Sequence, residues 1–266
     1  MSYLVWVGPR DIDCLQDPLF LDSVCYFSDK NILEFRAAKI YGNKFNKFIE
    51  KKMLQILTEH PDAKFIFYNP RIAYHLDVSL RQHVLCLNNN NLLNLLNDKI
   101  YTRYWLRRYV PVLPSIIMDA PSLSFQELEN GLGYSKQYVI QQNKSSGGLG
   151  TFILTRENGM LSALKENYKE LFIVSPYIYE GFSVNLNAII GSQNTVLLPI
   201  SLQLSERNKE RILYHGADYI AASAISENII TKLNDYANVI LMHIKQLGYL
   251  GIIGLDFLIT KDEIYF

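Results

Sequence analysis

The sequence predicts a protein of mixed class, in which an α/β unit is followed by α+β subdomains, and three observations predict it. The first ninety or so residues alternate short apolar runs with helical patterns, which is typical of a mainly parallel sheet. A Gly/Ser-rich loop lies between two β-rich runs within residues 138–155. An antiparallel meander and a long amphipathic segment, Ser226–Leu247, come after the loop.

The composition narrows the class of protein. A chain of 266 residues with 49% hydrophobic and 20% charged residues is typical of a globular protein with room for two packed units. Lys+Arg and Asp+Glu both number 26, so the zero net charge disfavours nucleic acid and membrane partners. No signal peptide is recognisable and no apolar run reaches the roughly 18 residues of a membrane span. Cys14, Cys25 and Cys86 have no paired spacing, which favours reduced, mostly buried thiols and a cytoplasmic location.

The elements of the α/β unit follow from hydrophobic periodicity and from turn residues. Pro9-Arg10-Asp11 after the first strand supplies none of the further glycines of a dinucleotide-binding turn. The run Asn88–Asn91 is the best candidate for a domain boundary. The expected elements are strands at 3–8, Ser23–Phe27, Lys64–Tyr68 and Val84–Leu87, and helices at Asn43–Glu59 and 70–80.

A basic amphipathic helix, Ile100–Tyr109, begins the next part of the chain, and Val110-Pro111-Val112-Leu113-Pro114 follows it. The cations of this region are most simply a solvated helix face. These cations are Lys99, Arg103, Arg107 and Arg108.

The Gly/Ser loop at Asn143–Gly150 carries three glycines within four residues. Such a backbone can turn several N–H groups toward one point, as phosphate-binding loops do, and a solvated hairpin loop is the alternative. Gly150 is followed by Thr151 and a β-like run, which excludes the Walker pattern. Beyond the loop we expect a helix at Asn158–Tyr168, strands at Leu171–Ile178, Phe182–Ile190 and Thr195–Leu202, and a hairpin of Gly251–Thr260 with Glu263–Phe266.

The order of these pieces resembles the ATP-grasp superfamily, and within it the biotin-carboxylase-like and amino-acid-ligase branch. The resemblance covers essentially the whole chain and implies three domains: an N-terminal Rossmann-like (pre-ATP-grasp) domain at 1–90, a linker helix and lid subdomain at 91–174, and a C-terminal antiparallel-sheet subdomain at 175–266. The matching motifs are Asp98-Lys99 at a helix, an expected strand at Val-Pro-Val-Leu-Pro, the Gly-rich lid, Tyr177-Ile178-x-x-Gly181 and Gly251-x-x-Gly254-x-Asp256-Phe257.

The same resemblance implies that ATP lies between two lobes with its triphosphate under the lid. Lys99 would then reach the nucleotide phosphates and Asp256 would be the first acidic Mg²⁺ ligand. Ser183 would face the ribose, and Gln203 would lie near the phosphates. The other implied ATP-binding residues, on the lid and the interlobe hinge, are Gln141, Ser145, Ser146, Gly147, Gly148, Gly150, Thr151, Ser175, Pro176, Tyr177 and Ile178.

Two departures from the family pattern stand out. Gln141 occupies the position of a lysine that usually contacts the α-phosphate or adenine, so affinity for ATP would suffer unless another cation compensates. The family's Glu-x-Asn segment, which brings the second metal ligands, would follow the last strand, where the sequence ends at Phe266. We therefore expect the C-terminal subdomain to be incomplete.

The resemblance implies an ATP-dependent, ADP-forming ligase that joins a carboxylate to an amine or a thiol through an acyl phosphate, with ATP and Mg²⁺ as cofactors. Metal ions and lid amides supply most of the catalysis in such chemistry, so no nucleophile or catalytic base is identified. Its partners would be small molecules, and family analogy permits a homodimer through the first domain. A degenerate module that binds nucleotide without catalysis, or a subunit completed by another chain, remain as alternatives.

Overall fold

The computed structural model of the chain describes residues 3–9, 22–26, 42–145, 148, 150–157, 159–208 and 210–266. The chain divides into two compact units, Met1–Leu93 and Asn94–Phe266. The division into three domains at residues 90 and 174 stays a prediction. Cys14, Ser146 and Gly147 lie outside the described residues.

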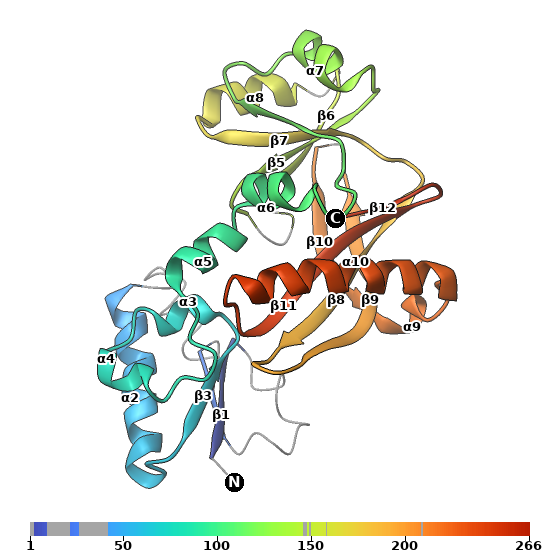
Figure 1. Cartoon of the computed structure of the whole chain (residues 1–266). Helices are drawn as coiled ribbons and strands as arrows, with labels where there is room; N and C mark the ends of the chain where they lie inside the picture. Colours follow the sequence, from blue (N-terminus) through green and yellow to red (C-terminus); the bar gives the residue numbers. More distant parts are fainter. Residues whose placement is uncertain are drawn as a thin grey trace. The chain divides into compact units, whose positions relative to one another are not determined.

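The first unit is an α/β unit on a parallel three-stranded sheet, as the sequence predicts (Figure 1). The strand order is β2-β1-β3. Helix α2 buries Phe45, Ile49 and Met53, which recur every four residues, in a core with Val5 and Phe65 of the strands. The elements are β1 (Leu4–Gly8), β2 (Asp22–Cys25), α2 (Asn43–Glu59), β3 (Lys64–Phe67), α3 (Pro70–Ala73) and α4 (Val78–Arg81).

Two expectations for this unit are wrong. The single helix expected at 70–80 is two short helices, because the Asp77 side chain accepts a hydrogen bond from the Ser79 N–H at 2.8 Å and so begins α4 anew. The strand expected at Val84–Leu87 is a single bridge between Phe65 and Val84. Cys86 has a φ of 59°, and this left-handed conformation ends the extended run.

The thiols are more accessible than the sequence suggests. Cys25 is half-buried and donates to the Pro9 carbonyl oxygen at 3.0 Å, whereas Cys86 is exposed. Both are free cysteines. No helix within the described ranges has the length and the apolar character needed to cross a membrane.

The second unit contains an antiparallel sheet of order β4-β7-β5-β6, with two helices packed on it, in the segment predicted as the lid subdomain. Helix α5 (Asn90–Leu96) includes the residue at which the two units divide. The core of the subdomain includes Tyr138, Ile140, Phe152, Phe172 and Leu164. The elements are α6 (Lys99–Leu106), β4 (Ile116–Asp119), α7 (Phe125–Leu132), β5 (Tyr138–Gln142), β6 (Thr151–Leu154), α8 (Met160–Asn167) and β7 (Leu171–Pro176).

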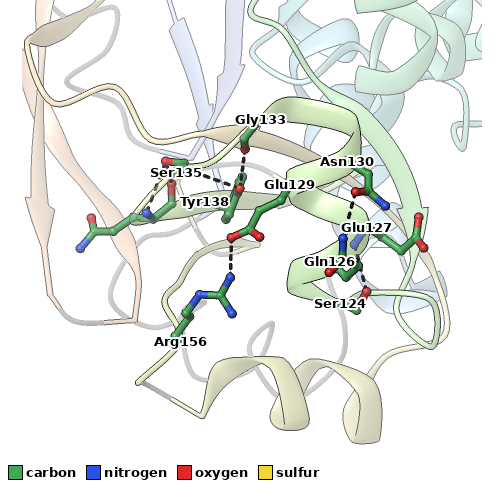
Figure 2. Close-up of polar contacts among 10 residues, drawn as sticks. Ser124, Gln126, Glu127, Glu129, Asn130, Gly133, Ser135, Tyr138 and Arg156 are labelled. Carbon is green, nitrogen blue, oxygen red and sulfur yellow. Dashed lines mark hydrogen bonds and ion pairs between the residues drawn. The ribbon is translucent and has the colours of Figure 1, made fainter.

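Side-chain contacts fix α7 against the β5–β6 hairpin (Figure 2). The buried Tyr138 hydroxyl donates to the Gly133 carbonyl oxygen at 2.7 Å and accepts from the Ser135 N–H at 3.2 Å. Arg156, after β6, forms an ion pair with Glu129 of α7. Two separate polar contacts therefore join α7 and the loop after it to the hairpin.

The C-terminal part of the second unit is a five-stranded antiparallel sheet of order β10-β9-β8-β11-β12. Helix α10 lies across one face of the sheet and buries a stripe of apolar residues that includes Leu233, Ala237 and Ile240 (Figure 1). Every second residue of β8 from Val184 to Ile190 is buried. The elements are β8 (Gly181–Ile190), β9 (Thr195–Arg207), β10 (Ile212–Asp218), α9 (Tyr219–Ala222), α10 (Glu227–Gln246), β11 (Gly251–Thr260) and β12 (Ile264–Tyr265).

Several elements of the second unit differ from the sequence expectation. The strand after the basic helix is β4, which begins at Ile116, because Pro111 and Pro114 cannot donate to a sheet ladder. Strand β9 extends past Leu202 to Arg207. Helix α7, strand β10 and helix α9 have no counterpart in the sequence prediction.

Candidate nucleotide-binding site

Asp256 lies on the polar face of the C-terminal sheet. Its neighbours Leu255 and Phe257 are buried, whereas Asp256 itself is exposed. Its Oδ1 accepts hydrogen bonds from Asn185 Nδ2 at 2.9 Å and from Gln203 Nε2 at 2.6 Å. Asn185 is the residue of β8 that pairs with Asp256 in the sheet register. Two amide donors from neighbouring strands thus fix the orientation of the carboxylate.

Ser183 lies on β8, the strand next to that of Asp256, and Gln203 lies on β9, one strand further along the sheet. Ser183 is two residues before Asn185 on β8, so both side chains lie on the same face, and Ser183 pairs with Leu258 of β11. Both Ser183 and Gln203 are half-buried. This face of the sheet therefore carries hydroxyl, amide and carboxylate groups, while the opposite face supplies the core under α10.

Lys99 is the first residue of α6, and its ammonium binds the lid loop. Nζ donates to the Gln142 carbonyl oxygen at 3.1 Å, to the Ser145 carbonyl oxygen at 2.5 Å and to Ser145 Oγ at 2.9 Å. Burial lowers the pKa of Lys99, the Arg103 charge lowers it further, and the Asp256 carboxylate opposes both effects. The charges of Lys99 and Asp256, which are far apart in the sequence, therefore act on each other in the folded chain.

The start of α6 is tied to the lid as well. Asp98 caps the helix by accepting from the Tyr101 N–H at 2.9 Å, and its other carboxylate oxygen accepts from Asn143 Nδ2 at 2.9 Å. Asn143 Oδ1 in turn accepts from the Ile100 N–H at 3.0 Å. The position of Lys99 and the first residues of the lid loop are thus set together.

The lid loop approaches the main chain of β10 at Gly148. Gly148 has a φ of +76°, and a Cβ there would lie 2.5 Å from the Ile212 carbonyl oxygen. Its own carbonyl oxygen accepts from the N–H of the buried Thr151 at 3.0 Å. At Gly150 a Cβ would meet the side chains of Gln142 and Ser145. The positive φ and the clash with main-chain atoms favour glycine at position 148, which lies close to β10.

Arg103 lies one turn after Lys99 on α6 and contacts Gln141. Its Nη2 donates to Gln141 Oε1 at 2.7 Å, and burial lowers the pKa of Arg103 to about 10. Nη1 is also buried and has no hydrogen-bond partner among the described residues. The interpretation of these cations as a solvated face is wrong for Lys99 and Arg103, because this face of α6 packs on the lid strands. Arg107 and Arg108 are exposed, as expected.

The hinge residues join the lid sheet to the C-terminal sheet. Ser175 is buried in β7, Pro176 ends that strand, and Tyr177 and Ile178 follow half-buried. The Tyr177 N–H donates to the Gln137 carbonyl oxygen at 3.0 Å, and the Arg207 guanidinium lies 4.3 Å from the centre of the Tyr177 ring. The roles of these residues in binding adenine stay predictions.

A magnesium ion fits this site only together with nucleotide phosphates. The described part of the chain brings together no group of three or more His, Cys, Asp or Glu side chains that could hold a metal ion. Asp256 supplies one oriented carboxylate, and Mg²⁺ is commonly held by one or two carboxylates together with substrate phosphates. The donor set is thus suited to a metal–nucleotide complex rather than to a metal ion alone.

Two site residues were not identified from the sequence. Arg103 follows Lys99 by four residues, a spacing that places both on one helix face, so periodicity could have found it. Asn185 is recognisable only from the pairing of β8 with β11.

A family model described as an ATP-grasp domain matches residues 96–266, so the chain belongs to the ATP-grasp family. No curated protein sequence matches it.

Solved structures share the fold at low sequence identity. N5-carboxyaminoimidazole synthetase from Staphylococcus aureus, complexed with ADP, is 16% identical with a TM-score of 0.59, over 99% of this chain and 62% of that one. D-alanine–D-alanine ligase from Bacillus anthracis is 13% identical with a TM-score of 0.59, over 99% and 85%. Biotin carboxylase from Campylobacter jejuni is 17% identical with a TM-score of 0.61, over 100% and 58%. The chain thus spans less than two thirds of the length of the synthetase and of the carboxylase.

Proposed function

We propose that this chain is the nucleotide-binding part of an ATP-dependent ligase, which joins a carboxylate to an amine or a thiol through an acyl phosphate and forms ADP. One observation carries the proposal: an ammonium at the start of α6, a Gly-rich lid and an oriented carboxylate on β11 are brought together within one unit. The family and the ADP complex of the similar synthetase support the choice of nucleotide.

Each group has a physical role in this proposal. The Lys99 ammonium is a point charge for a phosphate, which would take the place of the lid carbonyl oxygens at Nζ. The lid backbone around Gly148 would cover the phosphates and keep water from the acyl phosphate. The buried Ser175 and the residues that follow it would meet the adenine edge, and Ser183 the ribose.

Asp256 is the proposed magnesium ligand, with Gln203 and Asn185 holding its carboxylate. A magnesium ion bound there would neutralise charge on the transferred phosphoryl group. A cytoplasmic location and a dimer formed through the first unit belong to the same proposal.

Calorimetry of ATP binding with and without Mg²⁺ tests the proposal. The wild-type chain should bind ATP more tightly with Mg²⁺, and Asp256→Asn should remove most of that difference, at least about tenfold in Kd. Asp262→Asn, at an exposed position in the turn after β11, is the matched control and should bind like wild type. Absence of ATP binding to the wild-type chain would refute the proposal.

A nucleotide-binding module without catalysis is the second candidate, favoured by Gln141, an amide at the position where the resemblance expects a lysine. Release of ADP in mixtures of ATP, Mg²⁺ and panels of carboxylates and amines separates the two. ADP that forms only when both co-substrates are present supports the ligase. Tight ATP binding without turnover, even after mixing with candidate partner chains, supports the module.

A further inference from the structure

Gln141 stands where the ATP-grasp resemblance expects a lysine, and the structure places another cation beside it. Arg103 of α6 donates through Nη2 to Gln141 Oε1 at 2.7 Å. Gln141 lies in β5, between Thr151 of β6 and Ile173 of β7, so its backbone is held by the sheet on both sides. The contact joins residues 38 positions apart in the chain and is a product of tertiary packing.

The guanidinium of Arg103 is only partly satisfied. Nη2 has its partner in Gln141, but Nη1 is buried and has no partner in the part of the chain that the structure describes. A buried charged donor without an acceptor is costly, because the group has lost its hydration. Arg103 is protonated at neutral pH, since burial lowers its pKa only to about 10. The site therefore holds a positive charge that lacks one acceptor.

The neighbouring charge of Lys99 indicates the chemistry of the missing acceptor. Lys99 lies one turn before Arg103. The two positive charges repel each other, and the Arg103 charge contributes to the lowered pKa of Lys99. Two cations this close favour an acceptor that carries more than one negative charge. A nucleotide di- or triphosphate has this chemistry, and a guanidinium can meet a phosphate and an amide oxygen at once because its donors are fixed in a planar fork.

We propose that Arg103 binds a phosphate oxygen of the nucleotide through Nη1, in place of the lysine that Gln141 replaces, and that Gln141 acts as a positioning residue for the guanidinium. The inference rests on the proposed nucleotide-binding function. In the family pattern this phosphate-binding charge comes from the strand that corresponds to β5. Here it would come from helix α6, and the Gln141 amide would connect the two elements.

The test compares nucleotide affinities of variants by calorimetry, with thermal unfolding as a check of folding. Arg103→Gln removes the charge and should weaken ATP and ADP binding about 10- to 100-fold, while adenosine, measured by competition, should bind as before. Arg103→Lys keeps the charge but not the fork and should lose less. Arg108→Gln makes the same change on an exposed position just after α6 and is the matched control.

A charge-relocation variant makes the test sharper. Arg103→Gln combined with Gln141→Lys moves the cation to the strand and should recover ATP affinity to within about threefold of wild type, because a charged donor to the phosphate is restored. Recovery also keeps the inference testable if Arg103→Gln alone folds poorly. If the role of Arg103 were purely structural, Arg103→Gln would lower the stability of the fold and would weaken the binding of adenosine and of ATP equally.

The outcomes separate this inference from the proposed function. Suppose that the wild-type chain binds ATP. If Arg103→Gln then binds ATP as tightly as wild type, or loses affinity for adenosine as much as for ATP, the role of Arg103 is overturned and the proposed function stands. Failure of the relocation variant to recover affinity, when it is folded, also overturns that role. Absence of ATP binding to the wild-type chain overturns the proposed function itself.

Discussion

Gly148 is the point at which the lid loop can be tested without touching a charged group. Substituting alanine there places a methyl group 2.5 Å from the Ile212 carbonyl oxygen and 3.1 Å from Leu213 Cα. Ordinary van der Waals contact begins at 3.4 Å, so the loop must move away from β10. The substitution therefore affects the close approach of Gly148 to the main chain of β10.

The expected loss of ATP affinity follows from two free-energy costs. A non-glycine residue at the φ of +76° costs about 1 kcal/mol, and moving the loop off β10 costs about the same again. If the closed lid covers the phosphates, a total of about 2 kcal/mol raises the Kd for ATP about 30-fold. The midpoint of thermal unfolding should fall by only a few degrees, because the loop can open without disturbing either sheet.

The assay is calorimetric titration of Gly148→Ala with ATP and Mg²⁺, and Gly159→Ala is the matched control. Gly159 also has a positive φ, +62°, but a Cβ there meets nothing within 4 Å. The control therefore carries backbone strain without a clash, and its ATP affinity should equal that of wild type. If Gly148→Ala binds ATP as tightly as the control does, the closed loop plays no part in nucleotide binding and the reasoning is refuted.

Two further predictions concern stability. Tyr138→Phe should lower the free energy of unfolding by about 1–2 kcal/mol, because the Gly133 carbonyl oxygen and the Ser135 N–H lose their buried partner; an unchanged urea midpoint would count against it. Lys232 hydrogen-bonds Glu263 and lowers the pKa of that carboxyl. A lowered folded-state pKa stabilises the fold above the ordinary value of 4.5, and this stabilisation is lost as the pH falls below it. Glu263→Gln should therefore lower the free energy of unfolding by less than about 1 kcal/mol at neutral pH, because the pair is partly exposed, and should not change it in strong acid. Urea unfolding measured as a function of pH checks this, and a difference between variant and wild type that persisted in strong acid would contradict it.

The sequence by itself determined the elements whose pattern is local. Helices α2 and α10 follow from apolar residues on one face, and β8 and β11 follow from alternation between turn residues. Helix α7 was missed although Ser124 and Glu127 form the S-x-x-E signature of a helix start, which the structure bears out in the bond from the Glu127 N–H to Ser124 Oγ. Strand β10 was missed because an edge strand with polar residues has little periodicity of its own.

The tertiary structure alone decided the charge distribution of the candidate site. The sequence predicts that Lys99 and Arg103 share a helix face, but only the packing of α6 on the lid strands takes Arg103 out of water and sets it against Gln141. The pairing of β8 with β11 likewise brings Asn185 to Asp256 across 71 positions of sequence. Local patterns specify elements because neighbouring residues determine them, whereas burial of a charge and the identity of its partner depend on elements that are distant in the chain.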